Sequence, residues 1–106
     1  MEWEELSVNW DSEPLIKALK ELNIPFKITE QKTWYTVRVG KVSRTTIKLM
    51  PPYTFRFTDS YSDKGFCTET GHDNVLLVNT ITNQPLLYIR LAGEDYAREI
   101  VKVEKL

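Results

Sequence analysis

Residues 33–58 read TWYTVRVGKVSRTTIKLMPPYTFRFT, and the period of two in this stretch decides the fold class. Apolar side chains alternate with polar ones both before and after Pro51-Pro52, as in 37–39 (VRV) and 55–57 (FRF). Such alternation is typical of antiparallel strands with one buried face and one solvent face. Extending the same criterion along the chain, we expect strands at 25–30, 33–40, 44–50, 53–58, 74–80 and 86–91.

A helix is expected to precede these strands. Asp11 or Ser12 can cap it, and Pro14 lies in the first turn, where its missing N–H costs nothing. Asn23 tolerates a left-handed conformation, and Pro25 prevents the helix from continuing. The residues that recur at helical spacing between these signals are Leu15, Ile16, Ala18, Leu19 and Leu22.

The end of the chain fits two structures. Tyr96, Ile100 and Val103 are spaced as in a helix, whereas 101–104 (VKVE) alternates as in a strand. The acidic pair 94–95 suits a helix N-terminus, so we predict a short helix here.

These elements make one α+β domain over residues 1–106, with an N-terminal helix packed on an antiparallel β-meander of five to six strands and a short C-terminal helix. An acidic arm at 1–11 precedes the helix, with a short strand as the other interpretation, and a long acidic loop occupies 59–74. Strands 75–80 and 86–91 are apolar on both faces, which predicts burial under the helix or in a dimer interface.

Composition limits the cellular setting. One cysteine allows no intramolecular disulfide, and the acidic start 1–5 (MEWEE) does not resemble a secretory signal. The apolar runs are far shorter than the ~20 residues of a membrane helix. We therefore expect a cytoplasmic protein, or one inside a host cell if it is viral, with no membrane partner.

The net charge of −1 hides an uneven distribution. Residues 1–30 carry seven acids and three bases, and residues 59–74 carry four acids and one base. Between them, residues 31–58 carry six bases and no acid, and the remainder is balanced. An acid-free stretch of charge +6 in an acidic protein predicts a positively charged surface.

The alternation predicts where this charge lies. If the apolar residues of 35–39, 47 and 49 face the core, three neighbouring strands present one basic, threonine-rich face with a tryptophan at its edge. Hairpins centred near Val42 and Pro51 would align Arg38, Thr46 and Arg56 in one row. The candidate binding residues are Trp34, Arg38, Lys41, Arg44, Lys48 and Arg56.

Such a face predicts a small non-enzymatic nucleic-acid-binding protein, directed to single strands of DNA or RNA or to the backbone. Lys and Arg would contact phosphates, and Trp34 would stack on a base. Solvent faces of antiparallel sheets are, however, commonly rich in Thr, Lys and Arg. The pI near 5.8 also counts against a dedicated nucleic-acid binder.

The alternative hypothesis is a protein-interaction module: a dimeric regulator, or a viral or accessory factor that binds a partner protein. The division into acidic arm, basic sheet and acidic loop suits electrostatic complementarity. Trp3 and Trp10 are candidate anchors for such a partner, although tryptophans so close to a helix start commonly pack onto the helix.

Chemistry in the 59–74 loop is the third hypothesis. Cys67 and His72 lie five residues apart, which allows a nucleophile pair but does not fix its geometry. The single histidine excludes a two-histidine metal site within one chain. The acids of the loop match no EF-hand, so we predict no catalytic residue, no metal site and no cofactor.

Overall fold

The structure is mostly β rather than α+β. The computed structural model describes residues 2–58, 72–93 and 98–106. Strands account for 65% of the described residues and the one helix for 10%. The prediction of a helix packed on a five- to six-stranded meander was therefore wrong, because residues 2–9 and 99–105 also join the sheet.

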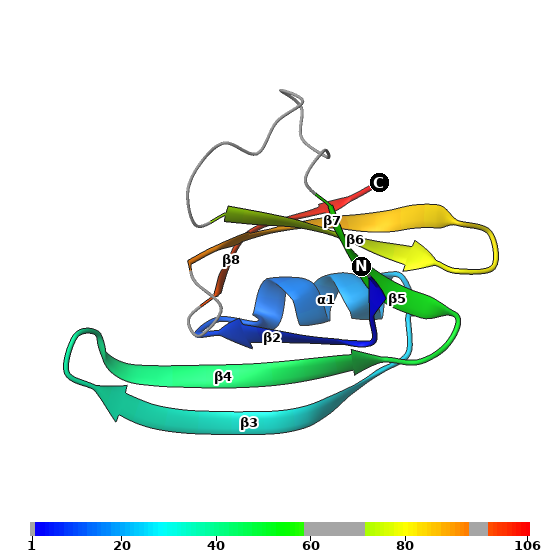
Figure 1. Ribbon diagram of the computed structural model, residues 1–106. Helices are drawn as coiled ribbons and strands as arrows, with labels where there is room; N and C mark the ends of the chain where they lie inside the picture. Colours follow the sequence, from blue (N-terminus) through cyan, green and yellow to red (C-terminus); the bar gives the residue numbers. More distant parts are fainter. Residues whose placement is uncertain (1, 59–71, 94–97) are drawn as a thin grey trace.

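Eight strands form one sheet in the order β1-β5-β6-β7-β8-β2-β4-β3 (Figure 1). All neighbouring strands are antiparallel except β2 and β8, which are parallel and meet only at Asn9 and Glu99. The elements are β1 (Glu2–Trp3), β2 (Glu5–Asn9), α1 (Glu13–Glu21), β3 (Phe26–Thr36), β4 (Gly40–Leu49), β5 (Tyr53–Thr58), β6 (His72–Asn79), β7 (Gln84–Ala92) and β8 (Glu99–Lys105).

The sheet curls because β1 and β2 are consecutive in the chain but far apart in the strand order. β1 pairs with β5 at one end of the order, whereas β2 pairs with β4 and touches β8. Only Glu4 connects the two strands, and its carbonyl accepts a 2.8 Å hydrogen bond from the Leu49 N–H. The strands from β1 to β2 therefore close around a common interior, and β4 and β3 continue beyond it.

Helix α1 lies between the two halves of the curled sheet (Figure 1). Its buried residues Leu15, Ile16, Ala18 and Leu19 belong to the same apolar cluster as residues of β2, β4, β5, β6 and β7. The inward residues of β6 and β7 are included in this cluster, so the chain's own core accounts for the burial of this face of the two strands. The strand residues of the core are Leu6, Val8, Ile47, Leu49, Phe55, Val75, Leu77, Leu87, Ile89 and Leu91.

The ends of α1 follow the sequence signals. The Asp11 carboxylate accepts a 3.0 Å hydrogen bond from the Glu13 N–H, while the Ser12 side chain makes no capping bond. At the other end, Asn23 has φ 56°, the left-handed conformation predicted for it. The Ile24 N–H then donates to the Leu19 carbonyl at 3.0 Å, which closes the last turn.

The predicted C-terminal helix is strand β8. Ile89 pairs with Val103 and Leu91 with Ile100, and a register shift between Arg90 and Leu91 brings both Val103 and Ile100 to the apolar face of β7. Strand pairing prevailed because β7 offers this segment a ladder of backbone hydrogen-bond partners. A helix this short is only marginally stable by itself. The acidic pair 94–95, on which the helix prediction rested, lies outside the described residues.

Two further predictions about the sheet were wrong. The strands expected at 25–30 and 33–40 are a single strand, β3, with a bulge between Ile28 and Glu30. Of the two interpretations of the first residues, the short strand is confirmed and the separate arm is wrong, because 2–9 forms β1 and β2 inside the sheet. Within the described ranges, no helix has the length and apolar character needed to cross a membrane.

Removing core volume at α1 should destabilise the whole domain. Leu19 has no solvent-exposed surface, and Leu19→Ala leaves a cavity between the two sheet halves. We expect the free energy of unfolding in urea to fall by about 2–5 kcal/mol. The matched control is Val101→Ala on β8, where the side chain is 55% exposed and the change should stay within about 0.5 kcal/mol. Equal effects of both variants would contradict this account of the core.

The contact between α1 and β8 predicts a shifted titration. Lys105 Nζ donates a hydrogen bond to Glu21, and this bond and the lysine charge lower the pKa of Glu21 below its ordinary value of 4.5. Because the folded pKa is lowered, the stabilisation is present above pH 4.5 and is lost as the pH falls through the folded value. Lys105→Met should raise the pKa of Glu21 towards 4.5, measured by NMR titration. An unchanged Glu21 titration would show that the pair does not form in solution.

Candidate interaction surface

The β3–β4 hairpin extends beyond the rest of the sheet (Figure 1). β2 pairs with β4 only from Arg44 to Lys48, whereas β3 pairs with β4 as far as Thr36 and Gly40. Beyond Arg44 the two strands therefore form a ribbon with no third strand among the described residues. This ribbon lengthens the molecule, whose largest extent is 45 Å.

Three apolar side chains stand bare at the end of this ribbon. Tyr35 is 77% exposed, Val37 105% and Val39 59%. The prediction that they face the core was wrong, because Val37 and Val39 lie in and beside the turn that connects Thr36 to Gly40. We call the exposed side chains of Tyr35, Val37 and Val39 the apolar tip.

A cation–π contact between Trp34 and Arg44 lies behind the apolar tip. Trp34 pairs across the strands with Val42, which is only 2% exposed. The Arg44 guanidinium lies 5.1 Å from the centre of the Trp34 ring, a cation–π distance. The Trp10 N–H donates a 2.8 Å hydrogen bond to the Ser43 carbonyl, which ties the base of the ribbon to the end of β2. The ribbon is thus held in a defined position.

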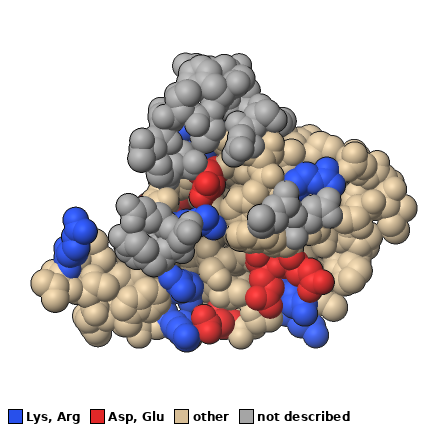
Figure 2. All heavy atoms as spheres, in the orientation of Figure 1, with Lys and Arg blue, Asp and Glu red and all other residues tan. Residues whose placement is uncertain are grey.

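The charged residues at the tip are basic. Arg38 lies in the turn and Lys41 follows on β4, and both are exposed. On the face seen in Figure 2, a basic group stands without an acidic neighbour at the turn end of the hairpin, whereas basic and acidic groups adjoin each other further along. The tip therefore combines apolar surface with positive charge.

The other predicted site residues are not gathered with the tip. Lys48 forms a 3.6 Å ion pair with Glu4 and lies opposite Glu5 in the register. Arg56 lies on β5, which pairs with β1 and β6 and not with β4, and it donates to Asn83 Oδ1 at 2.8 Å. The expected three-strand row of Arg38, Thr46 and Arg56 was wrong for this reason. The hairpin brings four of the six together: Trp34, Arg38, Lys41 and Arg44.

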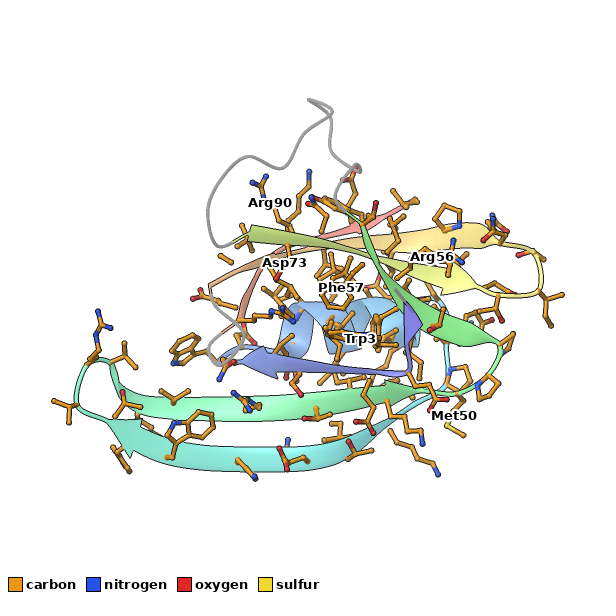
Figure 3. All side chains as sticks on the ribbon, viewed as in Figure 1. Trp3, Met50, Arg56, Phe57, Asp73 and Arg90 are labelled. Carbon is orange, nitrogen blue, oxygen red and sulfur yellow. The ribbon has the colours of Figure 1, made fainter. Side chains whose placement is uncertain are left out.

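The sequence analysis did not predict a groove that lies between the N-terminal strands and the start of β8. A groove of about 540 Å³ is lined by Trp3, Glu4, Glu5, Leu6, Ser7 and Arg98. Trp3 packs on Phe57 with ring centres 4.4 Å apart, and Arg98 lies 5.3 Å from the same Phe57 ring. Figure 3 shows Trp3 and Phe57 side by side, with Asp73 above them. Trp3 therefore packs onto β5, not onto the helix start.

Arg98 closes one end of this groove. Its Nε lies 3.1 Å from the Asp73 carboxylate, and its side chain is only 16% exposed. Arg98 already has a carboxylate and an aromatic partner, and two acids line the groove beside it, so the groove offers no surplus positive charge for an anionic ligand. The only signal in the sequence was the apolar–acidic start 1–5, which does not specify a groove.

The last residues of the predicted acidic loop, His72 to Asn74, belong instead to strand β6, and 59–71 lie outside the described residues. The Cys67 hypothesis and the acids at 59, 63 and 69 lie outside the described residues. Among the residues that the structure does describe, no three His, Cys, Asp or Glu side chains are grouped as metal ligands would be.

Comparison with protein-family models, with curated proteins and with solved structures found no match to this chain. The function is therefore argued from the geometry of the hairpin.

The apolar tip should be dispensable for folding. Val37→Ser with Val39→Ser removes only exposed methyl groups, and we expect the free energy of unfolding to change by less than about 0.5 kcal/mol per site. Val42 lies on β4, three residues after Val39. Val42→Ala removes buried methyl groups and should lower the free energy of unfolding by roughly 1.5 kcal/mol. Urea denaturation of the two variants tests this contrast. A large loss in the double variant would mean that the tip packs against the domain in solution.

Proposed function

We propose that this protein is a non-enzymatic protein-binding module that contacts its partner with the β3–β4 hairpin. The observation that carries the proposal is the apolar tip: Tyr35, Val37 and Val39 are exposed at the end of a projecting ribbon and contribute nothing to the core. Apolar side chains grouped on an extended element, rather than scattered singly, are typical of interaction sites.

The energetics support a role in binding. Covering a valine or a similar side chain is worth about 1.5–3 kcal/mol. A partner that covers the apolar tip therefore gains several kcal/mol before the cost of association is subtracted. Trp34, partly buried beneath Arg44, holds the base of the tip rigid, which lowers the ordering cost on binding.

The partner should be a protein with an acidic rim around an apolar pocket. Arg38 lies between the two valines, and Lys41 follows two residues after Val39. Charged residues around an apolar centre are the usual arrangement of an interface rim. Aliphatic methyl groups form neither hydrogen bonds nor ion pairs with a phosphate backbone. The Trp34 ring is already stacked with the Arg44 guanidinium. These two observations favour a protein over a nucleic acid, although Arg38, Lys41, Arg44 and Trp34 would also serve a nucleic-acid binder.

The proposal predicts a partner that depends on the tip. The full chain, Val37→Asp with Val39→Asp, and the matched control Ile81→Asp are each used for affinity capture from cells that express the protein. Ile81 is 81% exposed at the β6–β7 turn, so its variant places one carboxylate, where the tip variant places two, at an exposed apolar position elsewhere. We expect one protein to be retained by the wild type and the control and lost by the tip variant, and then to bind directly when purified.

Two outcomes would overturn this proposal. If the tip variant retains every partner that the control retains, the tip is not the contact. If capture is abolished by nuclease, and purified chain binds single-stranded DNA or RNA with an affinity that falls steeply between 50 and 200 mM salt, the partner is a nucleic acid.

A further inference from the structure

Strand β3 is the outermost strand of the sheet in the described structure. It is 11 residues long and pairs only with β4. No residue of β3 is buried: seven are exposed and four are intermediate. A long strand that adds so little to the core leaves one row of backbone N–H and C=O groups without a neighbouring strand.

The two halves of β3 differ as edges. Near the start of the strand, the bulge between Ile28 and Glu30 and the charge of Lys27 interrupt the edge, as natural proteins do to prevent unwanted pairing. From Glu30 to Thr36 the register with β4 is unbroken. This regular stretch of seven residues is about 23 Å long at the usual rise per residue.

Charge decides what can lie beside this edge. The ribbon from Glu30 to Arg44 carries four bases and one acid, a net charge of +3, and the acid, Glu30, lies 3.4 Å from Lys32 Nζ. A second copy of the chain would bring another ribbon of charge +3 to within the ~4.8 Å spacing of paired strands, and like charges facing each other across strands are destabilising. An acidic strand would instead be attracted. The edge therefore favours an acidic segment of another protein over self-pairing.

We propose that β3 binds an extended, acidic segment of the partner as an added strand along Glu30–Thr36, an inference that rests on the proposed protein-binding function. Backbone hydrogen bonds supply the pairing, and alternate side chains supply the specificity. Lys32 and Trp34 lie on one face of β3, opposite Arg44 and Val42, and Thr33 and Tyr35 lie on the other. The segment should thus place a carboxylate beside Lys32, which that carboxylate would share with Glu30, and an apolar side chain beside Tyr35.

The test uses a defined probe on the full chain. The probe is a capped seven-residue peptide of alternating Glu and Val, titrated into isotope-labelled protein and followed by backbone amide NMR. We expect shift changes concentrated on 30–36 and slowed hydrogen exchange of those β3 amides that do not face β4. The same peptide with lysine in place of glutamate should not bind. Replacing two adjacent central residues by Pro-Pro should abolish binding, because it removes donors from both edges of the peptide.

A charge reversal provides the matched control within the protein. Lys32→Glu should weaken binding of the Glu-Val peptide roughly fivefold or more, the effect of losing an exposed charge pair and gaining a repulsive one. Lys17→Glu on α1 makes the same change in net charge at another exposed position and should leave the affinity unchanged. Both variants are compared with the wild type by the same NMR titration.

Several results would overturn strand addition without touching the proposed function. These are no binding of the Glu-Val peptide, binding that survives Pro-Pro, or shift changes confined to 37–39. If sedimentation shows self-association through β3, a second copy of the chain is the occupant of the edge. This result rejects the inference whether or not Lys32→Glu abolishes the self-association. Retention of partners by the Val37→Asp, Val39→Asp variant rejects the proposed function by a separate readout.

Discussion

The single residue between β1 and β2 is the constraint on which the rest of the structure depends. Glu4 connects a strand at one end of the sheet to the sixth strand in the order, and a connection this short requires the two to lie close together. The sheet therefore curls and encloses α1. The same constraint places β4 and β3 outside the curl, because β2 is already the strand that closes it. One short connection thus separates an enclosed core from a projecting hairpin.

This separation divides the residues that stabilise the fold from those that we propose bind a partner. The core residues lie on α1, β2, β5, β6 and β7 and on the half of β4 that pairs with β2, and most of them have no solvent exposure. β3 has no buried residue. Changes in β3 or at the apolar tip therefore cost little folding energy, while the core keeps the hairpin in a fixed orientation. Binding residues are commonly carried in this way, on extensions from a rigid scaffold.

The distribution of charge follows the same division. Acids of the first residues meet the basic segment where β2 lies beside β4, as Glu4 does with Lys48. Because β2 reaches β4 only from Arg44 to Lys48, this neutralisation ends where the ribbon begins. Arg38 and Lys41 lie beyond that point. A protein with a net charge of −1 can therefore present a positively charged end.

Local interactions let the sequence by itself determine the helix, its end at Asn23, and the inward side of 47–49. The basic segment was equally readable, since charge is a property of the residues alone. Only the tertiary structure decided which strands are neighbours and how far each one is covered. Val37 and Val39 alternate just as Ile47 and Leu49 do, yet the first pair is exposed and the second is buried. The period of two fixes which residues share a face, but burial of that face requires a partner distant in sequence, and β2 covers one end of the hairpin and not the other.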